Sequence, residues 1–150
     1  FQNTGAFSET LVVGGDNIFL FPLRPLWDKF LDQEHHMITA LHEEKLNSLQ
    51  RTGVLELSDL NQVIRLHEKP KKPPSQYFSP PLYLFKSSAK NRLVHYMNDV
   101  KSMDASGHFV DYLCQKETVQ AIKSEEGRLD IGNMESYQKA NELYNNRSDA

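Results

Sequence analysis

Three segments of this 150-residue chain place charged side chains beside glycine or proline, a pattern that suits the binding of a cation or a phosphate. Asp16 follows an apolar run at residues 11–13 and a pair of glycines. Asp130 follows a short apolar segment and stands two residues before Gly132. The tripeptide Glu68-Lys69-Pro70 lies between the two acids in the sequence. Because open α/β sheets bind ligands beyond the carboxyl ends of their strands, the three segments are candidates for one site.

These residue types favour a metal ion and a phosphorylated sugar as ligands. If the strands before Asp16 and Asp130 end on the same edge of a sheet, two carboxylates could share one cation. Hard oxygen ligands, with phosphate completing the coordination sphere, suit Mg²⁺. Glu68 can accept hydrogen bonds from sugar hydroxyls, and Lys69 can meet a phosphate as a point charge. Gly53 starts a predicted strand and would let a ligand press on the backbone.

Each of these segments also has an ordinary structural interpretation. An aspartate at a strand end often forms a turn or caps a helix, which applies to Asp16. A Glu-Lys pair before proline is often a solvated strand end, and Asp130-Ile131-Gly132 can be a simple turn. The order and spacing of the three segments together favour a binding site.

The elements that must position these residues alternate between strands and helices. Apolar residues at positions 23, 26, 27, 30 and 31 predict one helical face. Two runs around the polar turn 58–61 predict a β-hairpin. The full set of predicted strands is 11–13, 37–41, 53–57, 62–67, 82–85, 118–122 and 127–130. The predicted helices cover 23–31, a segment capped by Ser87 or Ser88 with Leu93, Tyr96, Met97 and Val100 on one face, a short helix at 109–114, and a last helix carrying Tyr137, Ala140 and Tyr144.

This alternation indicates a single α/β domain over residues 1–150 with a mostly parallel, mixed sheet. The loop at 70–81 carries five prolines and is predicted to contain neither a helix nor a central strand. The residues 102–107 are predicted to form a polar loop.

Composition narrows the class of protein and its partners. The net charge is −3, which argues against a basic nucleic-acid surface or attraction to an anionic membrane. No apolar run is long enough to span a membrane, and no signal-peptide pattern opens the chain. Cys114 is the only cysteine, so it cannot form an intrachain disulfide, and a reducing, cytoplasmic setting is expected. Its apolar neighbours predict that Cys114 packs in the core.

The histidines do not form a recognisable metal motif. His35, His36 and His42 lie within or beside a predicted strand, and their spacing differs from the helical zinc pair. His67 neighbours Glu68, but a surface position on the hairpin is expected for it.

The order of these segments resembles the sugar-1-phosphate nucleotidylyltransferases, and the glucose-1-phosphate thymidylyltransferase group is the most similar. Residues 15–19 resemble the family's metal-binding strand end, and 129–132, followed by Ser136-Tyr137, resemble its second one. Thr52-Gly53-Val54 with Glu68-Lys69-Pro70 resemble its sugar-phosphate segment, and residues 81–85 resemble a strand with a conserved tyrosine. The resemblance covers nearly the whole chain and implies a Rossmann-like three-layer sandwich.

The chain departs from that family pattern in several places. The family begins with a Gly-rich loop that holds the nucleoside triphosphate, and nothing before Asp16 matches it. Thr52, Pro81 and Leu129 stand where the family usually has tyrosine, glycine and an aromatic residue. The expectation is therefore a fold that is incomplete at its N-terminus, comprising the C-terminal sugar-phosphate- and metal-binding portion of the enzyme.

The resemblance implies roles for five residues and leaves alternative functions open. Asp16 and Asp130 would hold Mg²⁺, Glu68 and Lys69 would bind the sugar-1-phosphate, and Gly53 would give a backbone contact. A nucleoside triphosphate would bind only if the missing part were supplied, so the isolated chain is expected to be inactive. The alternatives are a non-catalytic sugar-phosphate-binding module and a self-associating interaction module, with a homo-oligomer among the expected states.

Overall fold

The computed structural model of the protein describes residues 9–99 and 105–148. Its strands are β1 (Glu9–Val13), β2 (Asn17–Phe19), β3 (His36–His42), β4 (Gly53–Leu57), β5 (Val63–Glu68), β6 (Tyr77–Phe78), β7 (Leu82–Lys86), β8 (Val119–Ser124) and β9 (Arg128–Asp130). Its helices are α1 (Leu23–Leu31), α2 (Leu46–Leu49), α3 (Ser88–Asp99), α4 (Ser106–Cys114) and α5 (Met134–Ser148). The predicted strands and helices are thus present, with β2, β6 and α2 in addition. Val100 of the predicted helical face lies outside the described residues.

The central sheet is mixed, but the prediction that it is mostly parallel was wrong. Its order is β1-β7-β3-β6-β4-β5, and β8 pairs with β3. Among the described strands only the β3–β8 pair is parallel, whereas β7 runs antiparallel to both β1 and β3. The alternation of helices and strands suggested crossovers between parallel neighbours. Instead, two helices, α3 and α4, separate β7 from β8, and β4 and β5 form a hairpin.

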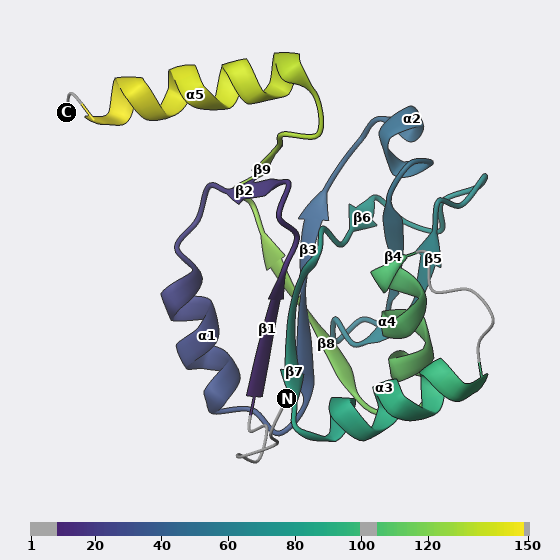
Figure 1. Cartoon of the computed structure of the whole chain (residues 1–150). Coiled ribbons are helices and arrows are strands. Elements are labelled where there is room, and N and C mark those ends of the chain that lie inside the picture. Colours follow the sequence, from purple (N-terminus) through teal and green to yellow (C-terminus); the bar gives the residue numbers. More distant parts are fainter. Residues whose placement is uncertain (1–8, 100–104, 149–150) are drawn as a thin grey trace.

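One face of the sheet is covered by α1 (Figure 1). Phe30 is fully buried there against Met37 and Leu84, with Leu26 and Trp27 packed beside it. The Lys86 ammonium lies 4.1 Å from the centroid of the Phe30 ring. The predicted apolar face of this helix is therefore the one that packs, except that Leu31 is exposed.

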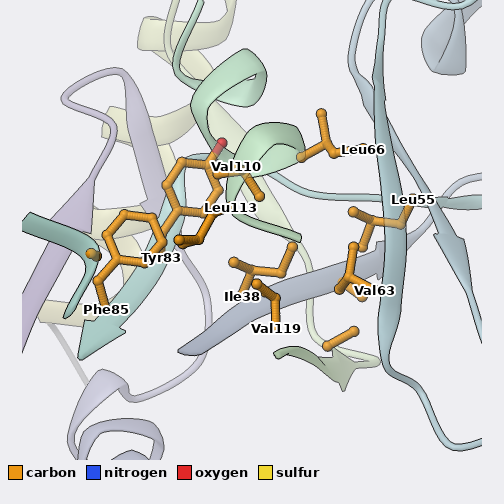
Figure 2. Packing of buried hydrophobic residues seen from close by; sticks show 12 residues of the cluster. Ile38, Leu55, Val63, Leu66, Tyr83, Phe85, Val110, Leu113 and Val119 are labelled. Atoms are coloured by element: carbon orange, nitrogen blue, oxygen red, sulfur yellow. The ribbon is translucent and has the colours of Figure 1, made fainter. Parts of the chain in front are cut away.

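The opposite face carries the larger core, shown in Figure 2, beneath α3 and α4. Val110 and Leu113 of α4 pack over Ile38, Tyr83 and other sheet residues. Because consecutive residues of a strand point to opposite faces of the sheet, Met37 packs against α1 and Ile38 packs in the larger core on the other face. The three-layer arrangement expected from the sequence is confirmed.

The Pro-rich loop contributes a strand to the middle of the sheet, contrary to the prediction. Tyr77 and Phe78 form β6, which pairs with β3 and β4. The dipeptide lies between Pro74 and Pro80, so both of its residues keep the N–H group that a ladder needs. A proline prevents strand pairing only at its own position, because it lacks the N–H group. The prediction was wrong because it applied this restriction to the whole loop.

The second sheet is small and joins two segments far apart in the sequence. Strands β2 and β9 pair antiparallel, with Asn17 opposite Asp130. Helix α5 follows β9 and extends away from the central sheet (Figure 1). Ala140 is buried, but Tyr137 of the predicted helical face is exposed. None of the described helices has the length and apolar character needed to cross a membrane.

Candidate functional site

A pocket of about 450 Å³ brings together all five residues that the sequence analysis selected. It lies where the hairpin, the start of β7, the start of α4 and the small sheet meet. Its lining comprises Asp16, Asn17, Arg51, Thr52, Gly53, Leu66, Glu68, Lys69, Phe78, Ser79, Pro80, Pro81, Tyr83, Ala105, Ser106, Gly107, Arg128 and Asp130. Among these described residues three side chains are acidic and three are basic, so the pocket can meet both cations and anions.

Glu68 is held in the pocket by two glycines from distant segments. A Cβ atom on Gly107 would lie 2.5 Å from Oε2 of Glu68, and one on Gly53 would lie 3.4 Å from the same oxygen. The same two positions would approach the Leu66 side chain to 2.9 Å. The carboxylate, 18% exposed, therefore occupies space that only glycine leaves open. Gly53 therefore allows the side chains of Glu68 and Leu66, on the neighbouring strand β5, to lie close to its backbone.

Lys69 has a backbone conformation that lysine rarely adopts. Its φ is 47°, in the left-handed region, although Pro70 follows it. Its N–H donates to the carbonyl of Thr52 at 3.0 Å, which holds the end of the hairpin closed. The ammonium is 65% exposed and lies 3.9 Å from Oε1 of Glu68. Strained residues that persist in a well-determined setting are enriched at binding sites, which supports a functional Lys69.

Asp16 and Asp130 reach the same pocket through the small sheet and not at the ends of two parallel strands. Asp16 stands in the turn before β2, and its carbonyl accepts the N–H of Ile131 at 2.9 Å. Asn17 donates to Oδ1 of Asp16 at 2.5 Å. The N–H of Gly132 donates to Oδ1 of Asp130 at 3.0 Å. The hydrogen bonds support the turn interpretation of both acids, and both acids also line the pocket.

Arg128 is a pocket residue that the sequence analysis missed. Its Nη1 donates to Oδ2 of Asp130 at 3.0 Å and also to Oδ1 of Asn17. The guanidinium packs over the ring of Phe78, 5.6 Å from its centroid. Residues two apart on a strand share a face, so Asp130 itself could have indicated Arg128.

The carboxylate pair fits a divalent cation only in part. Within residues 9–99 and 105–148, no three His, Cys, Asp or Glu side chains are grouped to hold a metal ion. Mg²⁺ commonly uses one or two carboxylates and takes its remaining ligands from water and substrate phosphates. The donor set of Asp16 and Asp130 matches that requirement, provided that a phosphate enters the pocket.

Tyr83 and Ser106 form the wall beside α4. The Tyr83 hydroxyl lies 3.5 Å from Oγ of Ser106. Burial raises the pKa of Tyr83, and the nearby Glu68 carboxylate raises it further. The phenol therefore stays protonated and can donate a hydrogen bond into the pocket. Sequence analysis placed residues 102–107 in a loop, whereas α4 begins at Ser106, so Ser106 and Gly107 were missed.

Replacement of Gly107 tests how the pocket holds Glu68. In Gly107→Ala the new methyl group must displace the Glu68 carboxylate, and a flexible side-chain end can move without unfolding the protein. We expect the affinity of the pocket for its ligand to fall about threefold. We also expect thermal stability to fall, because the same methyl group would lie 2.9 Å from the buried Leu66 side chain. Calorimetry and thermal melts measure the two effects. Unchanged affinity in the folded variant would contradict the role of Gly107 in positioning Glu68.

A second polar cluster, at the opposite end of β3, looks like a catalytic triad but has the wrong geometry. The N–H of Lys86 donates to Nδ1 of His36, so the proton of the neutral ring is on Nε2 and donates to Glu117 at 2.8 Å. Ser88 also donates to Glu117, at 2.6 Å, and thus not to the imidazole. Arg92 completes the network at 2.5 Å from Glu117. The cluster joins β3, β7, α3 and the segment before β8 through hydrogen bonds.

Cys114 and His67 occupy the places that the sequence predicted. Cys114 packs against the main core, and burial raises the pKa of its thiol to about 12. His67 pairs with Glu56 across the hairpin at 2.9 Å, away from the pocket lining.

Comparison with known proteins identifies a family. The family model described as nucleotidyl transferase matches residues 2–147. The glucose-1-phosphate adenylyltransferase of Thermosipho africanus (strain TCF52B) is 26% identical over 133 residues, which are 87% of this chain and 32% of that protein. The chain thus spans about a third of the length of this relative.

Solved structures show the same fold. A structure described as a glucose-1-phosphate thymidylyltransferase from Bacillus anthracis, in complex with sucrose, matches with a TM-score of 0.71 and 25% identity. That match covers 91% of this chain and 54% of the other. A UDP-glucose pyrophosphorylase complexed with UDP-glucose matches with a TM-score of 0.77 at 15% identity, over 93% of this chain and 57% of the other, and this likeness concerns the fold alone.

Proposed function

Since this chain belongs to the nucleotidyl transferase family, we propose that its pocket binds the sugar-1-phosphate in nucleotidyl transfer. The resemblance to sugar-1-phosphate nucleotidyltransferases is confirmed. The observation that supports the substrate is the convergence of Gly53, Glu68 and Lys69 with the two aspartates in one pocket.

In the proposed reaction, a phosphate oxygen of the sugar-1-phosphate attacks the α-phosphorus of a nucleoside triphosphate. A new oxygen–phosphorus bond forms, and the bond to the bridging oxygen breaks, so that pyrophosphate leaves with the electron pair. The nucleophile is already an anion, and positioning with charge neutralisation supplies the catalysis. Lys69 binds the sugar phosphate, Glu68 accepts hydrogen bonds from sugar hydroxyls, and Tyr83 donates from the opposite wall.

The proposal includes a divalent cation held by Asp16 and Asp130. Mg²⁺ bound there would neutralise phosphate charge. The two acids are oriented by Asn17 and Gly132, which keeps their carboxylates facing the pocket. A reducing, cytoplasmic setting is also part of the proposal, supported by the single cysteine.

Titration calorimetry with glucose-1-phosphate tests the substrate. We expect the chain to bind this ligand and Glu68→Gln to bind it more weakly, since an amide replaces an acceptor of sugar hydroxyls. Glucose-6-phosphate is a control with the same groups in another arrangement. Equal affinity of the wild type and Glu68→Gln would remove Glu68 from the site, and no binding of glucose-1-phosphate would refute the proposed substrate.

We further propose that these 150 residues alone do not catalyse nucleotidyl transfer, because the sequence contains no segment matching the family's Gly-rich triphosphate loop. Incubation with glucose-1-phosphate, dTTP and Mg²⁺ should release no pyrophosphate. Clear release above a no-protein control would show that the chain binds and positions the nucleotide without that loop.

A self-associating, non-catalytic interaction module is the second candidate, supported by the edge of the sheet. β1 is at one end of the strand order, and its Leu11 and Val13 are 38% and 43% exposed. An apolar hollow of about 500 Å³ lies beside it, lined in part by Val12, Phe85 and Leu93. Exposed apolar edge strands favour pairing with a further strand.

Sedimentation velocity should therefore show association of the chain that increases with concentration. The double variant Leu11→Lys, Val13→Lys places charges on the exposed edge and should remain monomeric. Identical concentration dependence of both proteins would exclude this edge as the contact.

A further inference from the structure

The geometry points to Arg128 as the internal counter-ion of the Asp16–Asp130 pair, which lowers the affinity of that pair for a divalent cation. This inference rests on the proposed metal role of the two aspartates. It concerns a residue for which neither the sequence analysis nor the proposed function gave a role.

The first observation is that Arg128 contacts Asp130 directly and is linked to Asp16 through the Asn17 amide. Its Nη1 lies 3.0 Å from Oδ2 of Asp130. The same nitrogen donates to Oδ1 of Asn17, whose Nδ2 in turn donates to Asp16. The positive charge therefore pairs with Asp130 and lies one hydrogen-bonded amide away from Asp16.

The second observation is that packing holds the guanidinium in place. The Arg128 side chain is only 14% exposed, whereas Asp130 is 55% exposed. It lies over the Phe78 ring, where stacking and cation–π attraction favour arginine. A side chain confined in this way cannot simply move into solvent when another cation approaches.

These two observations determine how the site responds to a metal ion. Both carboxylate oxygens of Asp130 already accept a hydrogen bond, one from Gly132 and one from Arg128. A divalent cation at Oδ2 would have to displace the guanidinium or bind beside a like charge. An anion such as a phosphate would remove that repulsion, so Arg128 makes cation binding depend on the anionic ligand.

Titration of the 150-residue chain with Mn²⁺, followed by electron paramagnetic resonance of the free ion, tests the inference. We expect Arg128→Gln to bind Mn²⁺ at least about fivefold more tightly than the wild type, because a charge-assisted contact to one ligand is removed. Arg51→Gln is the matched control. It removes the same charge from the same pocket but leaves the Arg128 contacts intact, so its affinity should change by less than about twofold.

The outcomes separate this inference from the proposed metal site. Equal or weaker Mn²⁺ binding by Arg128→Gln, or an equal gain in Arg51→Gln, would overturn the role of Arg128. Loss of binding in Asp16→Asn and Asp130→Asn supports the metal site independently, and unchanged binding in both would refute that site. Glucose-1-phosphate binding tests the proposed substrate in either case.

A measurement on the wild type covers the case in which Arg128→Gln does not fold. In a ¹⁵N spectrum, saturating Mg²⁺ should shift the side-chain Nε–H signal of Arg128 together with the backbone signal of Gly132. A shift of Gly132 with an unmoved Arg128 signal would overturn the inference. So would the absence of any shift.

Discussion

Lys69→Ala should bind glucose-1-phosphate at least about tenfold more weakly than the wild type, because one charge-assisted contact to phosphate is worth roughly 1.4 kcal/mol in an open pocket. The ammonium is largely exposed and its contact to Glu68, at 3.9 Å, is long, so its loss should leave the fold intact. Calorimetry gives the affinity, and denaturant unfolding gives the free energy of unfolding.

Lys69→Gly separates the side chain of Lys69 from its backbone. Glycine tolerates a φ of 47°, so this variant should be about 1 kcal/mol more stable than Lys69→Ala while binding as weakly. Lys71→Ala is a matched control in the same Pro-rich loop, outside the pocket lining, and should bind like the wild type. Equal affinity of Lys69→Ala and the wild type would remove Lys69 from the site.

Glu117→Gln should lower the free energy of unfolding at pH 7 by about 2 kcal/mol, since it leaves Arg92 without a charged partner and weakens the contact to buried His36. Burial alone would raise the pKa of Glu117, but hydrogen bonds from Ser88, Arg92 and His36 outweigh it and lower the pKa to about 2. The folded state therefore stabilises the ionised carboxylate.

This shift predicts the pH dependence of stability. The contribution of Glu117 is fully present above its unfolded pKa of 4.5 and is lost as the pH falls toward 2. Burial also lowers the pKa of His36, so protonation favours the unfolded chain as the pH falls below 6.5. Denaturant unfolding from pH 8 to pH 3 should show both losses in the wild type. Glu117→Gln should lack the loss below pH 4.5 that comes from the Glu117 carboxylate. Parallel curves for the two proteins would contradict the network.

Much of the fold follows from short-range patterns in the sequence. The helical spacing of Leu26, Trp27 and Phe30 predicted the packing of α1, and the two runs around residues 58–61 predicted the β4–β5 hairpin. Strand direction could not be predicted in the same way. It depends on how many helices separate two strands and on which strand inserts between them, as β7 does between β1 and β3.

The candidate site was predictable where a charged residue lies at or just after the end of a strand. Asp16, Glu68, Lys69 and Asp130 all have this local signature, and the structure places them around one pocket. Gly107 and Arg128 have no such signature, because their importance comes from contacts with Glu68 and Asn17 that are distant in the sequence. The His36 network was missed for the same reason, since its members come from β3, α3 and the segment before β8.

The most direct test of the account is a ¹⁵N spectrum of the chain titrated with glucose-1-phosphate in the presence of Mg²⁺. The account predicts that the backbone signals of Gly53, Lys69 and Gly107 shift together with one apparent dissociation constant, while those of His36 and Glu117 stay in place. Shifts confined to residues outside the pocket, or no shift at millimolar ligand, would contradict the claim that this pocket binds a sugar-1-phosphate.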